Sequence, residues 1–149
     1  MKTEFQTQEE VAVGKVLIMT NPEHQKDWPK LEQAINGINQ TVTAINAVNN
    51  RKIQIPVQSI ISIESEDRMC NLKLENGNMY LYGKRLKYAE VEFRSNRFMR
   101  INNQTLINLN HVAQFTSSVN ARIQLLMKDG TTYIISRHYI KEFRRALSC

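Results

Sequence analysis

Two turn-forming dipeptides constrain the fold of this chain more than any other feature. Asn76-Gly77 and Asp129-Gly130 each interrupt a segment that is rich in apolar and β-branched residues. The runs that flank them are 72–74, 79–82, 123–127 and 132–135. Because both dipeptides readily adopt positive φ angles, they are typical of the type I′ turns that join neighbouring antiparallel strands. The sequence therefore predicts two β-hairpins with turns of this type.

Further strands are predicted before the first hairpin. Residues 53–57 and 60–63 are short apolar runs, and a polar loop is predicted over 64–68. Pro56 has no backbone N–H group, so it suits an edge strand or a connection. Residues 86–93 fit a short helix and a strand equally well. We expect a mainly β scaffold.

The end of the chain predicts a short amphipathic helix. Within 139–147 the apolar side chains fall on one face, while the basic side chains lie elsewhere. The apolar residues are Tyr139, Ile140, Phe143 and Leu147. Ser136 can cap this helix by accepting a hydrogen bond from a free backbone amide of the first turn.

Residues 1–50 predict a small β-α-β-like extension. Lys15–Met19 is an apolar run that indicates a short buried strand. Apolar residues at helical spacing follow Pro29, and Gly37 lies near the end of this predicted helix. Residues 41–48 are enriched in β-branched side chains, which favours a second strand.

The charged residues are divided unevenly along the chain. Residues 1–50 hold four lysines and six acidic residues, a balance of −2. Residues 51–149 hold 16 lysines and arginines against eight acidic residues, a balance of +8, and the two parts sum to the net +6. A positive field favours a polyanionic partner such as nucleic acid, although a charged face can also serve only solubility.

The composition excludes several classes of protein. Cys70 and Cys149 provide no disulfide framework, which favours a reducing, cytoplasmic setting. The N-terminus lacks the apolar stretch of a secretion signal, and no apolar run reaches membrane-spanning length. His24, His111 and His138 are far apart, and the five glycines form no phosphate loop. We expect no enzyme activity, no metal and no cofactor.

Basic and amide side chains stand inside an otherwise apolar, strand-like run at 97–109. Such groups are expensive to bury and need hydrogen-bond partners. Asn bonds adenine edges through two hydrogen bonds, so Asn102 and Asn103 suit base reading if they lie on a protruding loop. The commoner role of Asn in irregular backbone is to form a turn of its own.

Arg137 and His138 stand at the start of the predicted C-terminal helix. Positive side chains, free backbone amides and the helix dipole together favour a bound phosphate at such a place. The alternative is that Arg137 pairs with Glu142 while His138 faces water. Both interpretations are open on the residues alone.

The order of these features resembles the LytTR-type DNA-binding domain of bacterial transcription regulators, over about residues 53–147. The matching segments are 60–65, the first hairpin, 86–90, 97–101, 106–109 and the motif Ser136-Arg137-x-Tyr139. The resemblance implies an elongated stack of small antiparallel sheets with a short C-terminal helix, whose loops enter successive major grooves. It divides the chain into an N-terminal extension of residues 1–50 and a DNA-binding domain of residues 51–149.

The resemblance also assigns contacts residue by residue. The DNA-facing loops of the family fall at 68–70, 102–104 and 137–138, and backbone contacts are expected after Gly83. The predicted DNA-binding residues are Arg68, Met69, Lys84, Arg85, Arg100, Asn102, Asn103, Gln104, Arg137 and His138. Arg100 and Asn108 also match family positions, where the alternative role is to hold the loop in place; this structural role is the favoured one for Asn108.

Several of these positions depart from the family pattern. At three successive positions the family usually has Ser or His, then Lys, Arg or Asn, and then Ser. This chain has Asn102, Asn103 and Gln104 at these positions. His138 replaces the common second Arg of Ser-Arg-Arg-Tyr. The base preference of the family therefore does not carry over.

The resemblance implies a cytoplasmic regulator of transcription that binds specific double-stranded DNA as a homodimer on repeated half-sites. Residues 1–50 are too short for a phosphorylatable receiver domain, so we expect a stand-alone regulator with a membrane-protein partner and no small-molecule substrate. Residues 1–50 are then a dimerisation or regulatory segment. The alternatives are a β-rich protein-interaction module and a binder of single-stranded nucleic acid; a metal-dependent nuclease is a more distant third.

Overall fold

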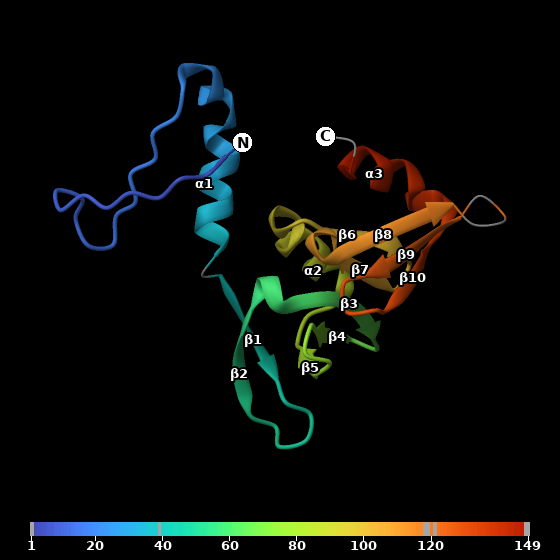
Figure 1. Ribbon diagram of the computed structural model, residues 1–149. Coiled ribbons are helices and arrows are strands. Elements are labelled where there is room, and N and C mark those ends of the chain that lie inside the picture. Colours follow the sequence, from blue (N-terminus) through green and yellow to red (C-terminus); the bar gives the residue numbers. More distant parts are fainter. Residues whose placement is uncertain (1, 39, 118–119, 121, 148–149) are drawn as a thin grey trace. The chain divides into compact units, whose positions relative to one another are not determined.

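The structure is a computed structural model that describes residues 2–38, 40–117, 120 and 122–147. The chain forms two compact units, residues 1–35 and 36–149 (Figure 1). The 3-10 helix η1 (Pro22–Asp27) of the first unit leads directly into α1 (Trp28–Gly37), which begins in that unit and ends two residues beyond it. This helix confirms the one predicted between Pro29 and Gly37. The Nε1 group of Trp28 donates a hydrogen bond of 2.7 Å to Thr20 Oγ1, so the start of the helix is tied to the preceding chain.

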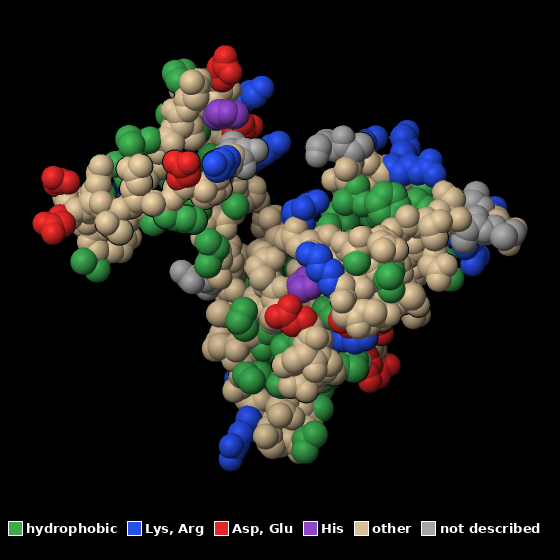
Figure 2. All heavy atoms as spheres, viewed as in Figure 1, with side chains coloured by type: hydrophobic (Ala, Val, Ile, Leu, Met, Phe, Trp, Pro, Cys, Tyr) green, Lys and Arg blue, Asp and Glu red, His purple; other side chains and the backbone are tan. Residues whose placement is uncertain are grey.

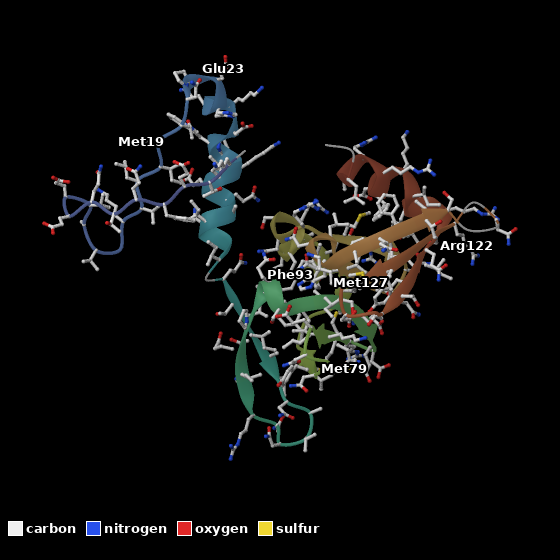
Figure 3. All side chains as sticks on the ribbon, in the orientation of Figure 1. Met19, Glu23, Met79, Phe93, Arg122 and Met127 are labelled. Carbon is white, nitrogen blue, oxygen red and sulfur yellow. The ribbon has the colours of Figure 1, made fainter. Side chains whose placement is uncertain are left out.

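The predicted strand at Lys15–Met19 is wrong. This run contains no strand, and the ribbon at Met19 is irregular (Figure 3). Val16, Leu17 and Met19 are 71%, 64% and 78% exposed. An extended run becomes a strand only where a neighbouring strand satisfies its N–H and C=O groups. No strand lies among the described residues of 2–35 that could do so. The β-α-β-like extension therefore lacks its first strand.

The strand predicted at 41–48 is present as β1 (Thr41–Ile45). It pairs along its whole length with β2 (Lys52–Pro56), and Ile45 pairs with Leu81 of β5 (Met79–Tyr82). The second compact unit therefore begins before residue 50. That residue 50 separates a dimerisation or regulatory segment from a DNA-binding domain stays a prediction.

Among the described residues, seven strands form the larger sheet, and all of their pairings are antiparallel. In spatial order they are β2, β1, β5, β4 (Met69–Leu74), β3 (Ile60–Glu66), β7 (Thr105–Asn108) and β6 (Phe98–Asn102). Pro56 belongs to β2 at one edge of this sheet, as predicted for a residue without an N–H donor.

The smaller antiparallel sheet consists, in the described part of the chain, of three strands. Their spatial order is β10 (Thr132–Ile135), β9 (Ile123–Met127) and β8 (Val112–Ser117). The helices of this unit are η2 (Val57–Ser59), α2 (Leu86–Glu92), η3 (Arg94–Asn96), η4 (Leu109–His111) and α3 (Arg137–Leu147). The predicted fold class, mainly antiparallel β with a short C-terminal helix, is confirmed.

Two local predictions are settled by the structure. The loop predicted over 64–68 is shorter than expected, because Glu64–Glu66 continue β3 and only Asp67 and Arg68 form the turn. The segment 86–93, which fitted a helix or a strand, forms α2 with Leu86 and Ala89 buried. These two positions are three residues apart, which is the spacing of one helix face.

Both predicted hairpins form, but their turns are not type I′. Gly77 and Gly130 have φ angles of +88° and +91°, whereas Asn76 and Asp129 are absent from the described residues with positive φ. The Asn76 and Asp129 Oδ1 atoms instead accept hydrogen bonds from the backbone N–H two residues on, at 3.0 and 2.9 Å. Each loop therefore has three residues and only its glycine in the left-handed region, which is the next commonest hairpin form.

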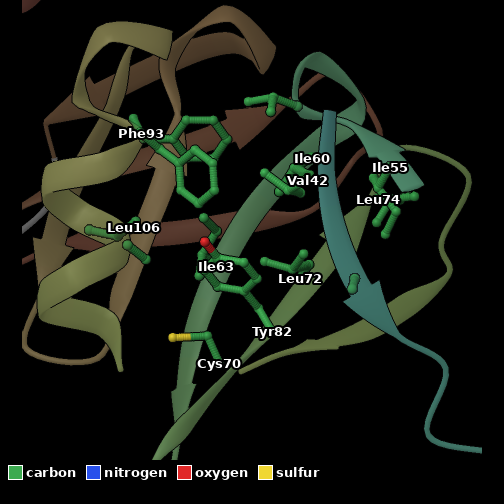
Figure 4. Close-up of a cluster of buried hydrophobic side chains, with 14 of the residues drawn as sticks. Val42, Ile55, Ile60, Ile63, Cys70, Leu72, Leu74, Tyr82, Phe93 and Leu106 are labelled. Carbon is green, nitrogen blue, oxygen red and sulfur yellow. The ribbon is translucent and has the colours of Figure 1, made fainter. Parts of the chain in front are cut away.

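The buried side chains of the described ranges form two clusters. One lies between the larger sheet and α2 and includes Phe93, Ile63 and Tyr82 (Figure 4). The other lies between the smaller sheet, strands β6 and β7, and α3, and it includes Phe143 and Leu125. Strand β3 contributes side chains to both clusters, so it connects the two buried cores.

Candidate nucleic-acid interface

The strand register brings several predicted DNA-contacting segments to one end of the larger sheet. Glu66 of β3 pairs with Met69 of β4, and Cys70 pairs with Tyr82, the last residue of β5. On the other side of β3, Glu64 pairs with Thr105, where the β6–β7 connection ends. The segments 67–68, 83–85 and 103–104 therefore emerge at the same end of the sheet, which we call the loop end.

The start of α3 joins this loop end. The backbone N–H and the hydroxyl of Ser136 both donate to the Ile101 carbonyl, at 3.0 and 3.1 Å. The Tyr139 hydroxyl donates to Asn103 Oδ1 at 3.4 Å. Arg137 and His138 therefore lie beside the β6–β7 loop.

The β6–β7 loop is held in one conformation by short-range contacts. Asn102 Oδ1 accepts a hydrogen bond of 2.8 Å from the Gln104 N–H, so the amide of Asn102 forms the turn that was its alternative role. The Gln104 carbonyl accepts from the Ser65 N–H at 2.8 Å, which links the loop to β3. Asn103 and Gln104 are exposed, so their side chains are the ones that the loop presents to solvent.

Arg100 holds this loop from the side that faces α2. Its Nε and Nη2 atoms each lie 2.7 Å from Glu90 Oε2, and its Nη1 donates to the Asn103 carbonyl at 2.8 Å. The Arg100 side chain is only 17% exposed. Its contacts are those of a residue that holds the loop, which was the alternative to a direct DNA contact.

Lys84 and Arg85 lie between β5 and α2. The Lys84 Nζ atom is 3.0 Å from Glu92 Oε2, and its side chain is 54% exposed. The Tyr82 hydroxyl donates to the same carboxylate, and burial together with this contact raises the pKa of Tyr82. Arg85 is exposed immediately before α2.

The remaining predicted residues differ in exposure. Arg68 is exposed in the turn after Asp67, which has a φ angle of +52°, whereas Met69 is half-buried and belongs to β4 instead of a loop. Arg137 Nε donates to the Asn120 carbonyl at 3.1 Å, a partner other than the Glu142 carboxylate considered from the sequence. His138 is exposed, with its ring edge-on to Tyr139 at a centroid distance of 4.9 Å.

A family model described as the LytTr DNA-binding domain matches residues 50–148. The chain belongs to the LytTR family. A solved LytTr DNA-binding domain, from a Bacillus cereus protein described as a methyl-accepting/DNA response regulator, superposes with a TM-score of 0.66. That match has 20% sequence identity and covers 74% of this chain and 99% of the other.

Proteins similar to this LytTR chain in sequence are bacterial sensory transduction proteins. LytT of Bacillus cereus is 24% identical over 108 residues and LytT of Bacillus anthracis is 23% identical over 126 residues; these matches cover 67% and 79% of this chain. LytR of Staphylococcus saprophyticus is 25% identical over 138 residues and 79% of this chain. The matches span 44%, 49% and 54% of these relatives, so the chain corresponds to about half of their length.

The structure of this LytTR chain also shows residues that the sequence did not connect to the loop. Glu90 holds Arg100, and the Tyr139 hydroxyl reaches Asn103 although Tyr139 was placed on the apolar face of its helix. An arginine within an apolar strand indicates a carboxylate partner, but the sequence does not say which of the acidic residues it is. Asn108 has the structural role favoured for it: it is fully buried, and its Nδ2 donates to the Ile60 carbonyl at 3.0 Å.

Within the described residues, no three His, Cys, Asp or Glu side chains come together as a potential metal site. Their helices include none with the length and apolar character needed to cross a membrane.

Proposed function

We propose that this LytTR-family chain regulates transcription by binding specific double-stranded DNA with the loop end of its larger sheet, without catalysing a reaction. The observation that carries the proposal is the convergence of segments 67–68, 83–85, 102–104 and 137–138, which are far apart in the sequence, at one place in the fold. Family membership supports DNA binding in general, and the convergence supports this particular surface.

The contacts within the loop end suggest a division of roles. Asn103 and Gln104 on the β6–β7 loop and His138 at the adjacent start of α3 are exposed, and they carry the donors and acceptors that base edges require. Arg68, Lys84 and Arg85 supply exposed positive charge for the phosphates, which fix position and carry no sequence information. In this proposal Asn102 and Arg100 shape the loop, Met69 supports it from β4, and Arg137 contacts a phosphate at the start of α3.

Selection of bound duplexes from a random library, followed by competition, tests this function. We expect enrichment of one sequence and stronger competition by that duplex than by its separate strands or by a scrambled duplex. Preference for the single strands would favour the nucleic-acid alternative. The absence of any duplex binding at low salt would overturn the proposal and favour a protein-interaction module. Cleavage of the duplex on addition of divalent ions would indicate a nuclease.

We also propose that the chain acts in the cytoplasm as a homodimer on repeated half-sites, and that its N-terminal region contributes to pairing or to contact with a membrane-protein partner. The support for this role of the N-terminal region is the exposed apolar run Val16–Met19, which lacks a neighbouring strand among the described residues. Because β1 belongs to the larger sheet, deletion of residues 2–35 is a better test than removal of residues 1–50. An unchanged oligomeric state and unchanged DNA cooperativity after this deletion would refute the pairing role.

A further inference from the structure

The outer face of α3 is strongly basic. The inner face packs on the second core cluster through Phe143, Tyr139, Ile140, Ala146 and Leu147. The exposed residues of the helix are Arg137, His138, Lys141, Glu142, Arg144 and Arg145. Four permanent cations and one carboxylate therefore share this face, and Figure 2 shows lysine and arginine side chains gathered over α3.

Three of these cations form a line along the helix. Arg137, Lys141 and Arg144 stand at positions i, i+4 and i+7, so they project from nearly the same side. Together with Ile140 they line a shallow depression on the surface of α3. Glu142 lies about 100° around the helix from Lys141 and so does not interrupt the line.

The dimensions of this line fit one strand of a duplex. Seven residues of α-helix span about 10.5 Å, at about 1.5 Å per residue. One DNA strand carries a phosphate about every 3.4 Å along the axis, so the line corresponds to the rise of about three phosphates. Like charges at these helical spacings repel one another, and of the three cations only Arg144 lies in the last turn, where the helix dipole favours a positive charge. Helix stability alone therefore does not account for the line.

We propose that Arg137, Lys141 and Arg144 form a phosphate-contacting ridge, the α3 ridge, which extends the DNA interface from the loop end onto the backbone of the flanking base pairs. The inference rests on the proposed function, because the ridge begins at Arg137 beside the β6–β7 loop. The ridge consists of cations without carboxylates or amides in line, so it suits phosphates and not base edges. It adds affinity without adding sequence preference.

The salt dependence of binding tests the ridge with the full chain and a selected duplex that has ten or more flanking base pairs. Each phosphate contact contributes about 0.9 to the slope of log affinity against log salt. We expect the double variant Lys141→Ala with Arg144→Ala to reduce the magnitude of this slope by about 1.8, and the ratio of selected to scrambled affinity to stay unchanged. The matched control is Arg51→Ala with Lys52→Ala, which removes two exposed cations at the β1–β2 hairpin.

The outcomes separate the ridge from the function on which it rests. If the wild-type chain binds no duplex, the proposed function fails and the ridge fails with it. If the wild-type chain binds specifically but the α3 variant keeps the wild-type slope, or the control variant reduces the slope equally, only the ridge is overturned. A second double variant, Lys141→Gln with Arg144→Gln, removes the same two charges but keeps side chains that favour a helix. If it unfolds at the wild-type temperature and also shows the reduced slope, the reduction comes from lost charge and not from a damaged helix.

Discussion

The loop end has an inner side, which packs on α2, and an outer side, which faces solvent. The two sides are built from different kinds of contact. On the inner side Arg100 and Tyr82 are largely buried, and each bonds a carboxylate of α2. On the outer side Arg68, Asn103 and His138 are exposed. A fixed inner layer that holds the outer side chains in place reduces the entropy lost on binding. Changes on the inner side should therefore alter stability and binding together, whereas changes on the outer side should alter binding alone.

The largest effect is expected for Arg100→Ala, on the inner side. It leaves Glu90 unpaired and removes the anchor of the Asn103 carbonyl. Because the pair is only partly buried, the loss in free energy of unfolding should lie between the values for exposed and buried pairs, at about 2 kcal/mol. Affinity for the selected duplex should also fall, because the loop is no longer fixed. Urea denaturation and fluorescence anisotropy measure the two effects.

Arg94→Ala is the matched control for this change. Arg94 is an exposed arginine of η3, so its replacement should change the free energy of unfolding by less than about 0.5 kcal/mol. Equal stability of the Arg100→Ala variant and the wild type would show that the inner side does not hold the loop.

Asn103→Ala should have the next largest effect and should act on DNA binding alone. Loss of a bidentate base contact costs about 1 to 3 kcal/mol, which is about five- to 150-fold in affinity for the selected duplex. The free energy of unfolding should change by less than about 0.5 kcal/mol, because Asn103 is exposed and its side chain loses only the long 3.4 Å hydrogen bond from Tyr139. Asn78→Ala, at the opposite end of the larger sheet, is the control. A similar loss on scrambled duplexes would mean that Asn103 contacts the backbone instead of a base.

Lys84→Ala tests a residue that has features of both sides, since its ammonium group bonds Glu92 while its side chain is half exposed. If it contacts a phosphate, the variant should lose affinity for all sequences alike, and the salt slope should fall by about 0.9. The free energy of unfolding should change by less than about 1 kcal/mol, as for an exposed ion pair. A changed base preference, measured by repeating the selection, would contradict a backbone role.

Local sequence patterns were sufficient for most of the fold. The hairpins at Asn76-Gly77 and Asp129-Gly130 formed where the turn residues stand, yet their type was mispredicted. The same side chains that tolerate positive φ also accept hydrogen bonds from the backbone two residues on, and the sequence does not distinguish these uses. The strand expected at Lys15–Met19 failed for another reason: a strand depends on a partner that local sequence does not reveal.

The candidate site was less accessible to local reasoning. Residue types alone favoured a turn-forming role for Asn102 and Asn103, and the family resemblance was needed to group them with Arg137 and His138. The structure adds the contacts that no sequence pattern contained, above all the pairing of Arg100 with Glu90 across two elements. Such pairings depend on the packing of α2 against the sheet, which is a property of the whole fold.

The smallest effect concerns Cys70, on the inner side beside Tyr82, and should appear only at alkaline pH. Burial raises the pKa of the Cys70 thiol from 9.0 to about 11, although the nearby Arg100 acts in the opposite direction. Between these pH values the unfolded chain releases the proton while the folded chain keeps it, so the free energy of unfolding falls as the pH rises. Urea denaturation between pH 7.5 and about 9.5, below the range in which unfolded tyrosine ionises, should show a shallower decline for Cys70→Ala than for the wild type. Parallel declines would show that the thiol is as hydrated in the folded chain as in the unfolded one, and that the inner side of the loop end is open to water.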